Sequence, residues 1–138
     1  MTITAATLLS AFYDVLASGS AGASVRAALG GSSSVISADD LAVGALPSAP
    51  FVALRGGPVA GVYRRDANQM TATWWLYDDW GGYKFARVDA LIDLVSNAYA
   101  ENALTYANVR RISVGAPVRD ASLGQRPTRS VVFQIGWR

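Results

Sequence analysis

The sequence predicts an α+β fold, in which a single sheet of four or five mostly antiparallel strands carries two long helices packed on one face. Two stretches, residues 3–18 and 84–99, repeat apolar residues every third or fourth position, as amphipathic helices do. Residues 69–77 are rich in Thr and aromatic side chains, as strands are. The 138 residues fit one domain that spans 1–138.

The first part of the chain is predicted to be mostly helical. The helix at 3–18 is followed by one or two further helical turns at 24–29, which Gly30 and Gly31 stop. A short strand is expected within 32–37, before a loop with two prolines. The stripe that the first helix turns inward is made of Leu8, Leu9, Phe12 and Leu16.

The strands are expected mainly after Pro50. Residues 51–65, which hold a Gly-Gly-Pro interruption, predict a hairpin or a bulged bend. The strand at 69–77 leads through the helix at 84–99 to a strand at 109–114, and this step is a right-handed crossover if the two strands run parallel. The last strand is predicted at 131–137.

Adjacent strand residues point to opposite faces of a sheet, so residues 70–77 define two different surfaces. Met70, Ala72, Trp74 and Leu76 share a wholly apolar face, which we expect to pack against the two long helices. The other face holds Trp75 and Tyr77 among threonines, and it is predicted to stay open and to form a subunit contact. The last strand alternates in the same way, with Val131, Phe133, Ile135 and Trp137 inward.

Several classes of function are disfavoured by composition. The chain has neither His nor Cys, so Ser-His-Asp and Cys-His catalysis is impossible and a zinc site is not expected. Carboxylates alone remain for acid–base or metal chemistry. The longest uncharged run, 41–54, is too short to span a membrane, and the first residues lack the basic region of a secretory signal. We predict no enzyme, no cofactor, no metal and no membrane contact.

Two glycine-containing segments have some features of ligand sites. Asp78 and Asp79 precede a Gly-Gly pair at 81–82, which is typical of some cation sites, but two adjacent carboxylates make a poor cage. We favour the interpretation that one acid blunts the strand end and the glycines turn the chain. The run at 56–61 lacks the Lys-Ser/Thr of a phosphate loop and is interpreted as a turn.

Arginine dominates the last third of the chain, with six Arg against one acid from Thr105 onward. Such a surface fits an acidic partner or nucleic acid, or else a solvated face in a chain from a GC-rich genome. Residues 116–129, APVRDASLGQRPTR, show no periodicity and predict a contact loop that is mobile until it docks. Core and interface roles are favoured over base stacking for the clustered aromatic residues. The interface candidates are therefore Trp75, Tyr77, Trp80, Arg119, Arg126 and Arg129.

The order of these segments resembles that of the tail terminator (tail completion) proteins of long-tailed bacteriophages. The likeness covers nearly the whole chain and rests on LLSAFYDVL, VRAALGG, SAPFVAL, TATWWLYD, FARVDALIDLVSNAY and VVFQIGW in this order. The stretch at 30–46 is longer and richer in Ala and Ser than that pattern, and WWLYDDW is unusually aromatic. A head-closure or neck connector protein of the same junction is therefore an alternative.

The resemblance implies a structural virion protein without catalysis or cofactor. Such a protein forms a ring, usually hexameric, on the last ring of the tail tube protein, stops tube growth and joins the tail to the head-closure or connector protein. It is assembled in the host cytoplasm and lies at the head–tail junction of the virion. DNA passes through the ring, so any contact with DNA is independent of sequence. Two classes outside phage structure stay open on the residues alone: a small carboxylate-dependent enzyme and a non-viral α+β binding module.

Overall fold

A computed structural model describes residues 3–37, 47, 50–61, 68–78, 85–100, 104–123 and 125–138, without the side chains of 58–61. The elements follow one another along the chain with three short 3₁₀ turns among them. They are α1 (Ala5–Ala17), η1 (Ser20–Gly22), α2 (Ala23–Leu29), η2 (Ser32–Ser34), β1 (Val35–Ser37), β2 (Phe51–Gly61), β3 (Asn68–Tyr77), α4 (Phe85–Ala98), β4 (Ala107–Val114), β5 (Val118–Asp120), η3 (Ala121–Leu123) and β6 (Arg126–Trp137).

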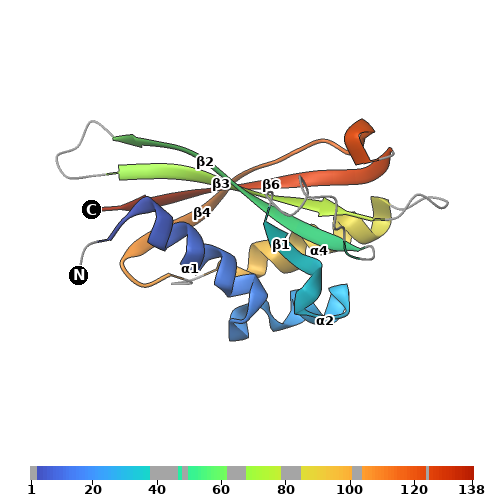
Figure 1. Ribbon diagram of the computed structural model, residues 1–138, viewed down its shortest axis with the longest axis horizontal. Coiled ribbons are helices and arrows are strands. Elements are labelled where there is room, and N and C mark those ends of the chain that lie inside the picture. The colour runs from blue at the N-terminus through green and yellow to red at the C-terminus, as the bar shows by residue number, and fades with distance from the viewer. Residues whose placement is uncertain are drawn as a thin grey trace.

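The strands form one mixed, six-stranded sheet in the order β1-β2-β3-β6-β4, and β5 also pairs with β6. Only β1 and β2 run parallel; the remaining pairs are antiparallel. Figure 1 shows α1, α2 and α4 beneath the same face of this sheet. The predicted α+β class and single sheet are confirmed. The predicted four or five strands are too few, since β5 is a sixth. The two long helices correspond to α1 and α4, and the helical turns predicted at 24–29 form α2, a third helix on the same face.

The helix α1 begins where Thr4 and Thr7 form a reciprocal cap. The Thr4 side chain accepts from the Thr7 backbone N–H, and the Thr7 side chain accepts from the Thr4 backbone N–H. Both bonds satisfy donors that the first helical turn leaves unpaired. The inward stripe of α1 is buried at Leu8, Phe12, Val15 and Leu16, and Leu9 is half-buried beside it.

Strand β2 is one continuous strand with a bulge, which selects one of the two forms predicted for this segment. Its register against β3 shifts between Gly56 and Val59. A Cβ atom on Gly57 would lie 2.0 Å from Thr71 Oγ1, so glycine permits the close approach of the two strands there. The hairpin in this region is formed by β2 and β3.

The core lies between the helices and the inner face of β3 and β6. Trp74 is fully buried and stacks on Phe12 with 6.2 Å between the ring centroids. Its Nε1 donates to the Tyr99 hydroxyl at 2.9 Å, and that hydroxyl donates to the Phe12 carbonyl at 2.6 Å. The predicted inner faces of both strands are confirmed: Met70, Ala72, Trp74, Leu76, Val131, Phe133, Ile135 and Trp137 are all buried against Phe12, Leu16, Leu91, Ile92 and Val95 in one cluster.

The crossover from β3 through α4 to β4 joins two parallel strands. Both strands are antiparallel to β6, which lies between them in the sheet. The sequence predicts a crossover here if the two strands run parallel, and this condition is met. Tyr99 at the end of α4 then fixes the helix to the middle of the sheet through Trp74.

The segment 116–129 is not a structureless loop, so that part of the prediction is wrong, while its role as a contact stays a prediction. Its middle forms β5 and η3, and its end forms the first four residues of β6. β5 pairs with β6 from Val118 opposite Thr128 to Asp120 opposite Arg126. Pairing with the long strand β6 sets this structure, and the three residues of β5 are too few to show a periodicity in the sequence.

Within the part of the chain described here, no helix is long and apolar enough to cross a membrane.

Candidate interaction surfaces

An ion pair between a buried carboxylate and a half-exposed arginine joins the end of β3 to α4. The Asp78 side chain is fully buried, and the Arg87 guanidinium grips both carboxylate oxygens, with Nε donating to Oδ2 at 2.8 Å and Nη2 donating to Oδ1. The Asp78 backbone N–H donates to the Pro127 carbonyl at 3.1 Å. Asp78 is thus a tie between elements, and our interpretation that an acid blunts the strand end does not fit it.

The pair also bears on the cation hypothesis. A carboxylate that accepts two hydrogen bonds from one guanidinium already has its countercharge. Asp79 and the Gly-Gly pair at 81–82 lie outside the described residues. Over the described ranges, no group of three or more carboxylates is arranged to hold a metal ion.

A second, smaller apolar cluster lies on the sheet face away from the helices. It is made of Ile36, Phe51, Ala53 and Tyr77, with Leu123 of η3 packed against it. The Tyr77 ring stacks on Phe51 at 4.8 Å, and its hydroxyl donates to Asp120 Oδ2 at 2.8 Å. Tyr77 is only 3% exposed. In the single chain this interface candidate is an interior residue, covered by the β5–η3 segment.

Asp120 holds that segment in place. Its Oδ1 accepts from the Ser122 backbone N–H at 3.0 Å and from the Ser122 hydroxyl, and its Oδ2 accepts from Tyr77. Partial burial works to raise the pKa of Asp120, but the hydrogen bonds from Ser122 and Tyr77 outweigh it and hold the pKa below its usual value. Burial, and then the Asp120 carboxylate, raises the pKa of Tyr77.

Beyond the cluster that contains Phe51 and Tyr77, the sheet face that points away from the helices is not covered by them (Figure 1). We call it the open face and define it by seven half-buried residues of β3 and β6: Gln69, Thr71, Thr73, Trp75, Ser130, Val132 and Gln134. Arg110 Nε of β4 donates to Gln134 Oε1 at 3.0 Å, and Gln134 Nε2 donates to Gln69 Oε1 at 2.7 Å. These bonds tie three strands together across one end of the open face, while Trp75 lies toward the other.

The three candidate arginines make different contacts. Arg119 is exposed, lies 5.7 Å from the Phe85 ring centroid and donates to the Gln125 carbonyl at 3.2 Å. Arg126 is half-buried, with its guanidinium 5.4 Å from the centroid of the Phe51 ring. Of the three, only Arg119 is exposed in the single chain.

Arg129 links β6 to α4. Its Nε donates to the Gly115 carbonyl at 3.0 Å, and its Nη1 forms an ion pair with Asp89 at 2.8 Å. Asp89 lies 40 positions away in the sequence, so no local pattern could reveal the pair. The remaining candidate, Trp80, lies outside the described residues.

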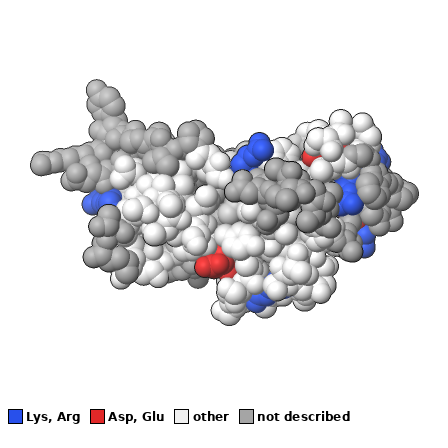
Figure 2. Space-filling model, viewed as in Figure 1, with Lys and Arg blue, Asp and Glu red and all other residues white. Residues whose placement is uncertain are grey.

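Figure 2 shows several basic side chains at the end of the molecule where β5 and β6 meet, on a view with few acidic ones.

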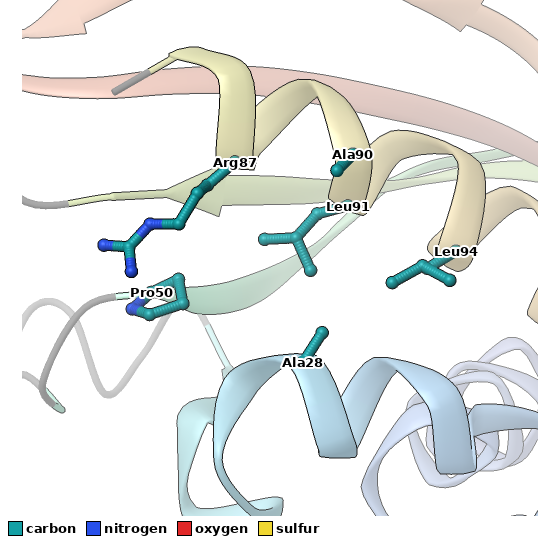
Figure 3. A pocket seen from close by; sticks show the side chains of 6 residues that line it. All are labelled: Ala28, Pro50, Arg87, Ala90, Leu91 and Leu94. Carbon is teal, nitrogen blue, oxygen red and sulfur yellow. The ribbon is translucent and has the colours of Figure 1, made fainter. Parts of the chain in front are cut away.

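Two hollows are lined by described residues. The smaller, of about 130 Å³, lies between α2, α4 and the start of β2. Figure 3 shows Leu91 and Leu94 pointing into it, while Arg87 extends along its rim past Pro50. This volume is below the roughly 300–1,000 Å³ of typical cofactor sites. The larger, of about 480 Å³, is a shallow basin beside the start of β4, with Tyr106, Trp137 and Arg138 in its lining.

Comparison of the chain with models of known protein families gives no match, and a search of curated proteins finds no similar sequence.

Proposed function

We propose that this protein is a ring-forming structural subunit of a phage tail, a tail terminator that caps the tail tube and joins the tail to the head connector. The order of the helices and strands along the sequence is the source of this proposal. The observation that carries it is the open face, whose seven residues of β3 and β6 carry no charge and are left half-buried by a single chain. Trp75 lies at one end of it, and the exposed Arg55 of β2 and Arg110 of β4 flank it, opposite Thr73 and Gln134. A head-closure or neck connector protein of the same junction has the same requirements and is the alternative.

The chemistry of the open face supports a protein contact. A sheet face turned to water usually carries charged side chains, yet the seven residues of the open face are Gln, Thr, Ser, Val and Trp. Charged residues are depleted at the centre of protein interfaces, and Trp is enriched where the binding energy concentrates. The Arg110–Gln134–Gln69 bonds hold this surface rigid, so less conformational entropy is lost when a neighbouring subunit docks.

The proposal assigns no catalysis to this chain. Asp78, the fully buried carboxylate, has its charge compensated by Arg87. The lack of His and Cys removes the commonest nucleophile and base pairs. The partners that we propose are further copies of this chain, the tail tube protein and a head-closure or connector protein. DNA that passes through the ring meets it without sequence preference.

Electron microscopy of particles made without this protein tests the proposal. We expect tail tubes of abnormal length, or tails that do not join heads, and we expect the wild-type chain supplied in trans to restore both. Trp75→Ala should fail to restore assembly, and Trp75→Phe, which keeps an aromatic ring at the same place, should restore it in part. Normal tails joined to heads in the absence of the protein would refute the proposal.

A further inference from the structure

The most exposed large apolar side chains of the described residues all lie along one edge of the molecule. Tyr106 is 69% exposed, Ile112 45% and Val118 48%. They occupy the turn before β4, the middle of β4 and the start of β5, in that order. Single exposed apolar residues need no explanation, but these three share one strand edge, which makes that edge a candidate contact surface.

This row follows an unpaired strand edge. β4 is the last strand in the sheet order, and within the described residues it pairs only with β6. β5 continues along the same strand β6 after a break at 115–117. Because alternate residues of an antiparallel strand direct their N–H and C=O groups away from the partner, the eight residues of β4 leave about four such residues unpaired.

The edge is basic, and its charges are not neutralised within the described chain. Arg110, Arg111 and Arg119 are exposed, and their hydrogen bonds go to the neutral groups of Gln134, Ser96 and Gln125. No described carboxylate forms a salt bridge with any of them. An added strand that carries acidic side chains would complement this edge.

A second copy of this chain is a poor occupant. Pairing β4 with the β4 of another copy would bring Arg110 and Arg111 against the same residues. The opposite side of the sheet offers β2 beyond the end of β1, where the exposed charged residue is Arg55. Like charges opposite each other destabilise strand pairing.

We propose that the β4–β5 edge binds an extended, acidic segment of a different protein as an additional strand of the sheet. Backbone hydrogen bonds to β4 supply the affinity, and the arginines select the acidic sequence. The basin at the start of β4 takes a bulky apolar side chain at one end of that segment, against Tyr106 and Trp137. Tyr106 has φ 67, a left-handed conformation that bulky residues rarely adopt, and it projects its ring beside the basin instead of into the core.

Peptide binding to the full chain tests the proposal. The probe is a fluorescein-labelled peptide of about ten residues, enough to span β4, that alternates Glu and Val and ends in Trp. We expect saturable binding by fluorescence anisotropy that weakens as salt is added. The matched Lys–Val peptide should bind roughly tenfold more weakly, and so should a Glu–Val peptide with N-methyl groups at alternate residues, which keeps the side chains and removes the backbone donors.

Variants locate the binding surface. Ile112→Asp should weaken binding of the acidic peptide, whereas Arg55→Glu on β2, a larger change in charge on the far side of the sheet, should leave it nearly unchanged. Tyr106→Asn tolerates the left-handed φ and should weaken only the peptide that ends in Trp. Equal binding of the N-methylated or Lys–Val peptide, or loss with Arg55→Glu alone, would overturn the proposal.

Two further outcomes separate this edge from other contacts. Self-association of the wild-type chain that Ile112→Asp abolishes would overturn the assignment to a different protein. The edge shares Arg110 with one end of the open face, but Trp75 lies toward the other end, so Trp75→Ala should keep peptide binding whether or not it blocks ring assembly. Failure of the proposed tail function therefore leaves this inference intact, and the peptide measurements can fail without affecting that function.

Discussion

Trp74 and Trp75 are neighbours in the chain, but the sheet sends them to opposite faces, and we predict opposite consequences of truncating them. Trp74 is fully buried in the core, stacked on Phe12 and hydrogen-bonded to Tyr99. Trp75 is half-buried on the open face, beside the cluster that contains Tyr77. The pair offers a matched comparison, because one residue type is removed from two adjacent positions.

The magnitudes follow from burial. Replacing a fully buried Trp by Ala costs about 3–5 kcal/mol, against a total stability of roughly 5–15 kcal/mol for a domain. In a domain of this size about 1 kcal/mol corresponds to ~3 °C, so Trp74→Ala should lower the melting temperature by roughly 10–15 °C or unfold the chain. Trp75→Ala removes a partly solvated ring and should cost about 1–2 kcal/mol.

Thermal melts followed by circular dichroism measure the loss of stability in both variants, and an assembly assay on tails measures their loss of function. Trp74→Phe serves as a control that keeps most of the core volume and removes the bond to Tyr99. We expect Trp75→Ala to stay folded and to impair assembly. An equal loss of melting temperature for the two Ala variants, or normal assembly with Trp75→Ala, would show that the faces or the interface are assigned wrongly.

Three further predictions concern stability. Arg87→Ala leaves the buried Asp78 carboxylate without its guanidinium, and urea denaturation should show a loss of about 2–4 kcal/mol in the free energy of unfolding, less than for a fully buried pair because Arg87 is half-exposed. The double variant with Asp78→Asn should recover part of this loss, and no recovery would contradict the ion-pair argument. Burial raises the pKa of the Tyr99 hydroxyl, so the unfolded chain releases the hydroxyl proton near pH 10 while the folded chain keeps it. The free energy of unfolding should therefore fall as pH rises above about 10, and it should fall less steeply in Tyr99→Phe. The lowered pKa of Asp120 stabilises the fold above the unfolded-state pKa of about 4, and this contribution is lost as pH falls. Asp120→Asn should therefore lower the stability of the fold at pH 7 and have little effect near pH 3, and equal effects at both pH values would contradict this.

The long elements of the fold can be predicted because their periodicity is repeated many times. α1, α4, β3 and β6 each bury a stripe or an alternate set of residues that the sequence displays, and the alternation identifies the inner residues of β3 and β6 one by one. Elements of three residues show no such periodicity: β1 lies within the short strand expected at 32–37, whereas the sequence does not predict β5. β5 exists because β6 offers it a partner, and Pro127 in that partner indicates a break in the sequence instead of a strand.

The side-chain ties are harder to predict than the elements. The Arg87–Asp78 and Arg129–Asp89 pairs depend on how α4 lies across the sheet, and the sequence does not record that orientation. One signal is present for the first pair: a lone arginine in the first turns of an apolar helix that follows an acid at a strand end. Alternation correctly predicts a half-exposed Trp75, but Tyr77 on the same side is covered, because η3 folds back over it.

The place of β6 in the middle of the sheet sets the order in which this protein can fold. β1, β2 and β3 can pair as they are made, but β4 has no partner among them and must wait for residues 126–137, which come later in the chain. Until then β3 has a bare edge, and β4 follows α4 as a strand without a partner. Insertion of β6 closes both at once through contacts distant in sequence, which makes folding slow and leaves the unfinished chain prone to aggregate.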